Sequence, residues 1–286
     1  MARVAIVTDS ASDLTPTDAA RADITVVPLL VSFGDEEFRA GVDLTAEDFW
    51  DRMLAPDAPF PRTAAAPPGD FKEAFERRFA QGADEIVCVN VGGKVSATLQ
   101  SALIAADLLP GRKIEVVDSE SASMGVGLLA LVAAELAAAG ADAAEIAATL
   151  RRRVADIEIH VAIDTLEYLR KGGRISGARA AVGTLLSVKP IITMRGGLVE
   201  QEERVRTMAK ARQRIIELFT SAPADRVALL AGPGTDTDSL ERDLLAAFGD
   251  RVDPSRITVE TMGPSIGPHI GPGFVGGVLL RRRQAR

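Results

Sequence analysis

Apolar residues in the first half of the chain fall into short runs that alternate with segments of helical spacing. The runs are rich in β-branched residues, as expected of buried strands, and they cover residues 4–7, 24–31, 86–91, 114–117 and 157–163. Helical spacing recurs between them at residues 96–109, 124–139 and 143–154. Strands that alternate with helices favour parallel βαβ units. The pattern therefore predicts a Rossmann-like α/β domain with a parallel sheet over residues 1–158.

The pattern changes after residue 164. Two apolar segments, 189–194 and 198–204, flank Arg195, Gly196 and Gly197, which is a tight hairpin signal. Further strands are predicted at residues 226–231, 257–261 and 276–281, with helices at 207–219 and 237–248 between them. The hairpin favours antiparallel pairing, so residues 159–286 are predicted to form an α+β domain with a mostly antiparallel sheet. The Pro- and Ala-rich residues 55–68 are expected to form a surface loop that crosses towards a ligand site.

Length and composition agree with two domains. The chain has 286 residues, of which 47% are hydrophobic, enough for well-packed cores. Its one cysteine, Cys88, lies in an apolar run and is expected to be a buried thiol, which excludes an internal disulfide. The N-terminus lacks the apolar region of a signal peptide, and the longest apolar stretch, residues 124–140, is too short to span a membrane. The sequence thus predicts a cytoplasmic protein without stable membrane insertion.

Charge is distributed unevenly around a net value of −7. Acidic residues dominate up to residue 158, and basic residues dominate after it. The two halves could attract each other or a polarised partner, although two ordinary solvated surfaces explain the same distribution. Aromatic residues make up only 4% of the chain, and the basic residues form no dense stripe, so nucleic acid is not expected as a partner.

Catalytic signatures fail on inspection. The Gly-Lys pair ending at Lys94 suggests a phosphate-binding loop, but Val95 stands in the Ser/Thr position and Cys88 in that of the first glycine. The segment around Ser265 matches G-x-S-x-G, yet no Asp or Glu follows it to complete the order of a hydrolase triad. His160 and the second histidine, His269, lack neighbours at metal-ligand spacing. No catalytic residue, metal or cofactor is therefore predicted.

Two hydroxyl-rich loops follow predicted parallel strands. Residues 8–13 contain Ser10 and follow the first strand, and residues 118–123 contain Ser119 and follow the strand at 114–117. Open parallel sheets present ligand crevices at the carboxyl ends of their strands. Turn formation and capping explain the same residues without a ligand, but two such loops at one sheet edge make a crevice the better expectation.

Several segments together resemble the DegV family of fatty-acid-binding proteins. They are Thr-Leu-Glu-Tyr-Leu-Arg-Lys-Gly-Gly-Arg-Ile-Ser at 165–176, the Gly/Pro loop at 263–273, Val-Thr-Asp-Ser at 7–10 and Val-Asp-Ser at 117–119. The resemblance runs from about residue 4 to residue 280. It implies that a long-chain fatty acid lies between the two domains, and that the bound lipid is the only ligand.

The resemblance also implies a function. Such a protein is not an enzyme: it shields the acyl chain in an apolar tunnel and presents the carboxylate to a separate fatty acid kinase. That kinase makes acyl phosphate from ATP for phospholipid synthesis. Burial of an acyl chain is worth about 0.8 kcal/mol for each CH₂ before the cost of association is subtracted, which allows tight binding.

Site residues follow from the same resemblance. Thr63 and His269 correspond to residues that contact the carboxylate. The loop that usually begins with two serines here has Gly92 and Gly93, followed by Ser96, and backbone N–H groups of the glycines are expected to replace the missing hydroxyl donors. Candidates for the lipid pocket, which ordinary core packing would explain equally well, are Ser10, Ser119, Met124, Leu185 and Ile266. Arg170 and Arg174 are expected to contact the kinase.

Two other classes of function remain open at this point. The chain could be a phosphotransferase-like enzyme that binds a small polar ligand at the strand ends, which would require convergent charged residues and a covalent or metal handle. It could also be a regulatory protein that binds partners through its acidic half. The first predicts a polar ligand, and the second predicts none.

Overall fold

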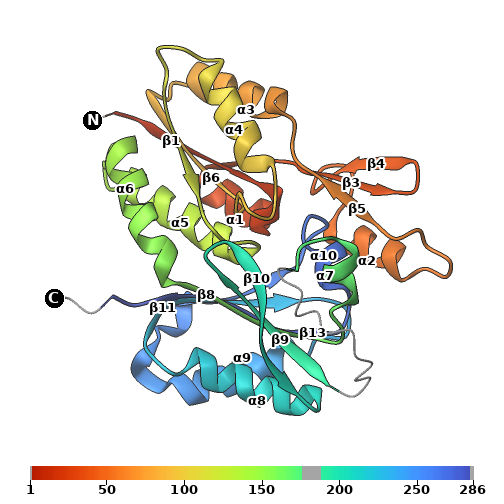
Figure 1. Cartoon of the computed structure of the whole chain (residues 1–286). Helices are drawn as coiled ribbons and strands as arrows, with labels where there is room; N and C mark the ends of the chain where they lie inside the picture. The colour runs from red at the N-terminus through yellow and green to blue at the C-terminus, as the bar shows by residue number, and fades with distance from the viewer. Residues whose placement is uncertain (1, 176–187, 284–286) are drawn as a thin grey trace.

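The computed structural model of the chain describes residues 2–175 and 188–283. Its first layer is a four-stranded parallel sheet in the order β2-β1-β6-β7. The strands are β1 (Val4–Asp9), β2 (Ile24–Val27), β6 (Glu85–Asn90) and β7 (Lys113–Asp118). Helices α3 (Pro68–Ala80) and α4 (Thr98–Asp107) cover one face, and α5 (Met124–Ala138) and α6 (Ala143–Arg153) cover the other (Figure 1). Helix α1 (Pro16–Arg21) packs on β2. The Rossmann-like first layer is confirmed.

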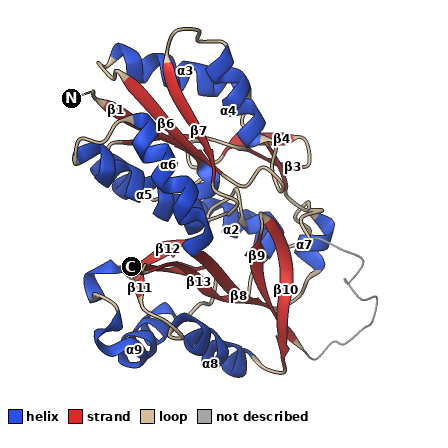
Figure 2. Cartoon of the chain, turned by 60° about the vertical axis from the view of Figure 1, so that its left-hand side comes forward, coloured by secondary structure: helices blue, strands red, loops and turns tan. Residues whose placement is uncertain are grey.

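The second layer is a six-stranded sheet in the order β10-β9-β8-β13-β11-β12. Only β11 and β12 run parallel to each other, and every other pair is antiparallel. The strands are β8 (Ile157–Ile163), β9 (Lys189–Arg195), β10 (Leu198–Val205), β11 (Ala224–Ala231), β12 (Ile257–Thr261) and β13 (Phe274–Arg281). Helices α8 (Met208–Phe219) and α9 (Thr237–Phe248) cover its outer face, while α5 packs on its inner face (Figure 2). The mostly antiparallel second sheet is confirmed as well.

The hairpin at the edge of the second sheet forms as the sequence predicts. Strands β9 and β10 pair from end to end around Gly196 and Gly197, whose φ angles are 53° and 77°. Positive φ at both central residues is the geometry of the turn that matches strand twist, and glycine adopts it without steric cost.

Two strand assignments from the sequence are wrong in detail. Strand β8 was counted with the first layer, but it pairs with β13 and β9 in the second sheet. The predicted domain boundary after residue 158 therefore falls inside this strand. The run at 24–31 is two strands, because Pro28, which has no backbone N–H, separates β2 from β3 (Leu30–Phe33).

Strand β3 belongs to a small third sheet that the sequence pattern did not reveal. Its order is β4-β3-β5, with β4 (Glu36–Arg39) and β5 (Arg62–Ala64) both antiparallel to β3. Strand β5 lies in the segment that was expected to be a surface loop, and it carries Thr63 opposite Val31. Helix α2 (Ala46–Leu54) follows β4 and begins at Thr45, whose hydroxyl accepts from the N–H of Asp48.

One apolar core lies between the two large sheets and reaches into the small sheet and α2. Phe49 on α2 is fully buried in it, with its ring tilted against Phe33 and edge-on to Trp50. A Cβ on Gly267 would lie 2.3 Å from the ring of Phe49, so α2 sits directly against α10 (Gly267–Ile270). Within residues 2–175 and 188–283, no helix has the length and apolar content to cross a membrane.

We expect Phe49→Ala to lower the free energy of unfolding by about 3–5 kcal/mol, because a fully buried ring leaves a cavity. Leu54→Ala on the same helix is the matched control: Leu54 is 51% exposed, so its loss should cost about 0.5 kcal/mol or less. Urea unfolding of both variants measures the difference. Equal effects would mean that α2 is not anchored through Phe49.

Candidate functional site

A cavity lies between the two large sheets. It holds about 760 Å³ of space free of protein atoms, counting the solvent at its opening. Most of its lining is aliphatic and comes from β8, β9, β10, β11 and the loops that carry Val95 and Ile266. The polar side chains on its wall are Thr63, Ser96, Ser123, Arg174, Thr193, Ser265 and His269. The lining suits an apolar ligand with a polar end.

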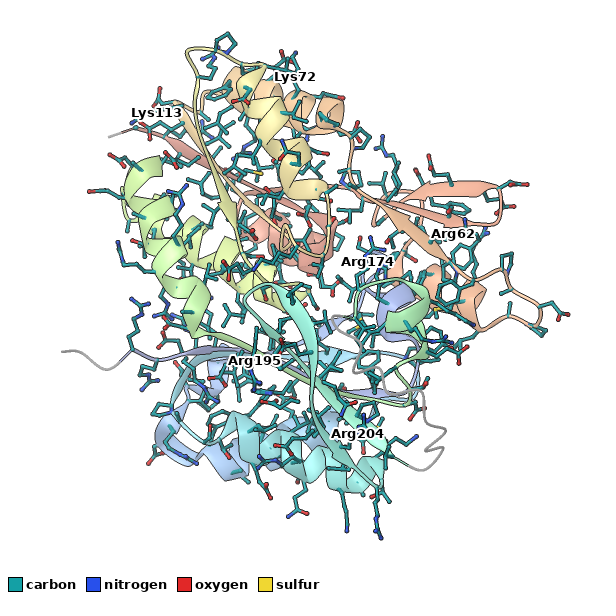
Figure 3. The ribbon with its side chains drawn as sticks, viewed as in Figure 1. Arg62, Lys72, Lys113, Arg174, Arg195 and Arg204 are labelled. Carbon is teal, nitrogen blue, oxygen red and sulfur yellow. The ribbon has the colours of Figure 1, made fainter. Side chains whose placement is uncertain are left out.

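Three of these polar residues mark the mouth of the cavity. Thr63, Arg174 and His269 line the cavity and also an outer hollow, where they meet Arg62 and Lys171. Figure 3 labels Arg62 on the outer side of the small sheet and Arg174 nearer the centre of the molecule. The mouth therefore joins an aliphatic interior to a basic, solvent-facing surface.

Thr63 and His269 are hydrogen-bonded to each other. The hydroxyl oxygen of Thr63 on β5 lies 2.9 Å from Nε2 of His269 on α10, which links the small sheet to the loop before β13. Burial, and then the positive charge of Arg174, lowers the pKa of His269 to about 4, so its ring is neutral at neutral pH. When Nε2 carries the proton, the histidine donates to Thr63, and the threonine hydroxyl proton is free to be donated to an anion.

Arg174 keeps its charge at the mouth. Its Nε donates to the carbonyl oxygen of Val95 at 3.2 Å, and another guanidinium nitrogen donates to the carbonyl of Gly172. Both partners are neutral, and no carboxylate of the described residues forms an ion pair with Arg174. A guanidinium with free donors can pair with a carboxylate in two-point geometry. Arg174, which the resemblance implied as a kinase contact, is half-buried and lines both the cavity and the outer hollow.

The glycines of the 92–96 loop do not offer the donors that were expected of them. The N–H of Gly92 donates to the carbonyl of Ser121 at 2.8 Å, and the N–H of Gly93 donates to the carboxylate of Asp118 at 3.2 Å. Both amides are occupied, and the Asp118 carboxylate would repel an anion there. Of this loop, Ser96 lines the cavity, while its hydroxyl also accepts from the N–H of Thr98.

The predicted pocket residues are placed differently from one another. Ile266 lines the cavity. Ser10 lies behind the wall, where its hydroxyl accepts from the N–H of Leu29 and contacts the hydroxyl of Ser265 at 2.8 Å. Ser119 lines a separate hollow, and Met124 is buried in the core between the sheets. Leu185 lies outside the described residues, and Arg170 is exposed on α7 (Glu167–Lys171).

A buried carboxylate that the sequence pattern did not single out braces this region. Asp13 accepts from the hydroxyl of Ser123 at 2.5 Å and from the N–H of Gly263 at 3.0 Å. It thereby joins the loop after β1, the start of α5 and the loop that carries α10. Burial raises the pKa of Asp13 to about 7. In the sequence, Asp13 is visible only as an acid in a hydroxyl-rich loop. Its hydrogen-bond partners, Ser123 and Gly263, lie 110 and 250 residues away along the chain, so the sequence pattern does not connect them.

The side chains at the mouth are groups that can bind an anion. The described residues contain no cluster of three or more His, Cys, Asp or Glu that could hold a metal ion. His160 is paired with Glu202 at 2.8 Å on the second sheet, away from the mouth. Hydroxyl, imidazole and guanidinium groups at the opening of an aliphatic cavity can hold an anion whose tail is apolar.

Comparison with known proteins gives consistent matches along the whole chain. A family model described as "Uncharacterised protein, DegV family" matches residues 3–282. A DegV domain-containing protein of Streptomyces coelicolor is 37% identical over 287 residues, which cover 98% of this chain and 99% of the relative. A DegV domain-containing protein of Deinococcus radiodurans is 36% identical over 280 residues, covering 96% and 98%.

Solved structures agree with these matches. The structure that reports fatty acid binding of a DegV family protein from Thermus thermophilus superposes with a TM-score of 0.88 at 34% identity, covering 98% of this chain and 100% of that one. DegV of Bacillus subtilis, described as a fatty acid binding protein, superposes with a TM-score of 0.87 at 27% identity, covering 99% and 100%.

We expect Asp13→Asn to weaken the pH dependence of stability, because the amide can accept from the N–H of Gly263 and donate to the hydroxyl of Ser123 without carrying a charge. The pKa of Asp13 is about 7 in the folded chain against 3.8 for a free side chain. Its contribution is therefore fully present below about pH 4 and is lost as the pH rises through about 7, by at most about 1.4 kcal/mol per pH unit.

Urea unfolding at about pH 5 and about pH 8 measures this contribution as a difference between wild type and variant. Asp9 and Glu260, whose pKa values burial raises to about 6 and about 7, titrate in the same direction in both proteins. Asp43→Asn removes an exposed carboxylate and serves as the control. The same loss of stability with pH in wild type and Asp13→Asn would contradict the assignment.

Proposed function

The chain belongs to the DegV family, and on that premise we propose that it binds one long-chain fatty acid. The acyl chain occupies the cavity between the two large sheets, at the junction of the proposed domains 1–158 and 159–286. The carboxylate lies at the mouth. The observation that carries the proposal is the placement of Thr63, Arg174 and His269 where the aliphatic cavity meets the outer hollow. Fatty acid binding by relatives with solved structures supports it.

The two ends of the cavity fit the two ends of such a ligand. Each buried CH₂ contributes about 0.8 kcal/mol before association costs, which favours an aliphatic wall. A carboxylate without partners would be costly to bury. The hydroxyl of Thr63, held by His269, and the guanidinium of Arg174 supply a donor and a positive charge at the mouth. Ser96 lies on the same wall and is a further hydroxyl in reach.

We further propose that the protein is a binding subunit and not an enzyme. It would present the carboxylate to a separate fatty acid kinase in the cytoplasm, which makes acyl phosphate from ATP for phospholipid synthesis. The basic outer hollow supports this proposal, because a carboxylate at the mouth can be reached from outside past Arg62 and Lys171. Arg170 is exposed beside it and is a candidate for the kinase contact. A phosphotransferase-like reaction on a small polar ligand is not favoured, since the cavity wall is mostly aliphatic.

We expect organic extraction of the purified protein, followed by mass spectrometry, to release about one free fatty acid per chain. Thr63→Val and His269→Ala should each weaken palmitate binding by about 1.5–3 kcal/mol, because each removes a hydrogen bond that serves a charged group. Thr17→Val, which removes an exposed hydroxyl on α1 away from the cavity, is the matched control and should bind as wild type does. A clean apoprotein that takes up neither added palmitate nor added oleate would refute the proposal.

We expect Arg170→Ala to leave the bound fatty acid in place and to reduce ATP-dependent acyl phosphate formation with the cognate kinase, since this side chain is exposed. Arg174→Ala should also reduce transfer, and it should weaken fatty acid binding as well because it removes the positive charge at the mouth. Circular dichroism checks folding, because Arg174 binds two backbone carbonyls. Unchanged fatty acid binding in Arg174→Ala would contradict the contact between Arg174 and the carboxylate, and unchanged transfer in both variants would contradict the kinase contact.

A further inference from the structure

The second sheet is split between two of its strands. Strands β8 and β9 pair only where Val161 and Ala162 meet Ile192 and Ile191. Residues 157–160 and 193–195 instead flank a hollow at the surface. In Figure 2 the β9–β10 hairpin rises from the second sheet towards the first, where Lys94 Nζ donates to the carbonyl of Gly196 at 2.7 Å. The hairpin tip is thus held to the first layer, and the sheet opens into a fork behind it.

The fork borders the inner end of the cavity. Ile159, Thr193 and Met194 line both the cavity and the hollow in the fork. Strand β8 runs from this fork to Ile163, which pairs with Phe274 close to α7 and α10. Four residues of strand span about 13 Å, so Ile159 lies about that far from the end of β8 that faces the mouth. The three shared residues form a wall at the end of the cavity opposite Thr63 and His269.

We propose that Met194, together with Ile159 and Thr193, is the end wall that sets the length of the bound acyl chain. This inference rests on the proposed function, because it assigns the methyl end of the fatty acid to this wall. Ile159 and Thr193 are buried within the sheet, whereas Met194 is half-buried and packs on the core between the sheets. Its unbranched and flexible side chain makes it the part of the wall that a substitution can open or close.

The chemistry beyond the wall explains why the wall limits length. In the hollow, His160 is bonded to Glu202 at 2.8 Å, and Arg195 is paired with the same carboxylate at 2.6 Å. Glu158 lines the hollow beside them. Methylenes that passed Met194 would leave an aliphatic wall for charged groups and water, so they would gain little from burial. A chain that ends at the wall therefore binds best.

The test compares competition binding of laurate, myristate, palmitate, stearate, arachidate and behenate to the full chain. Met194→Ala removes three heavy atoms at the wall and should shift the preferred chain to the next longer member of the series. A newly buried methylene is worth about fourfold in affinity, so the two extra methylenes of stearate should favour it over palmitate by about fifteenfold relative to wild type. Met194→Phe should shift the preference to a shorter chain.

Leu230→Ala is the matched control. It also removes three heavy atoms from the cavity lining, but Leu230 lies on β11 and does not border the fork. It should weaken binding of the whole series without moving the preferred length. Equal shifts in Met194→Ala and Leu230→Ala, or no shift in Met194→Ala, would overturn the end wall and leave the proposed function intact. Failure of the wild type to bind any member of the series would overturn the proposed function, and the end wall with it.

Discussion

Helix α5 sets the distance between the two large sheets. It packs against β1 and β6 of the first sheet and against β13, β11 and β8 of the second, and its first seven residues, 124–130, are all buried because both of its faces are covered there. A helix with side chains is about 10 Å across, so the sheets stay apart beyond its end as well. The cavity begins at Ala122 and Ser123, directly before α5 starts. Gly127 lets the helix approach the loop after β1, where a Cβ would lie 2.7 Å from the carbonyl oxygen of Ser12.

The charged groups around the cavity differ between its mouth and its inner wall. Arg174 and the basic outer hollow lie at the mouth, whereas the deeply buried acids Asp9 and Asp13 lie behind the wall near Ala11 and Ser123. Burial raises the pKa of both acids, to about 6 and about 7, which lessens their negative charge near neutral pH. An anion is favoured at the mouth and disfavoured beside these acids. The electrostatics therefore agree with the lining, which is polar at the mouth and aliphatic inside.

Periodicity predicted most elements within a residue or two, because burial of one helix face or of a whole strand is a local property of the chain. It could not assign β8 to a sheet, since a fully buried strand has the same pattern in either layer. The amides of Gly92 and Gly93 were misjudged for a similar reason: their acceptors belong to residues 118–121, which only the parallel pairing of β6 and β7 brings near. Arg174 turned inwards because the carbonyl of Val95, from the other layer, accepts its Nε–H.

The mouth is assembled from three segments that lie far apart in the sequence. Thr63 belongs to the small sheet, His269 to the loop before β13 and Arg174 to the turn after α7. The hydrogen bond between Thr63 and His269 spans 206 residues of sequence. A carboxylate held there would contact all three segments, and its acyl chain would contact both large sheets. Because such a ligand binds only when the layers are assembled, its binding free energy adds to the stability of the assembled fold. A substitution that separates the two large sheets should therefore lower both the affinity for the ligand and the free energy of unfolding.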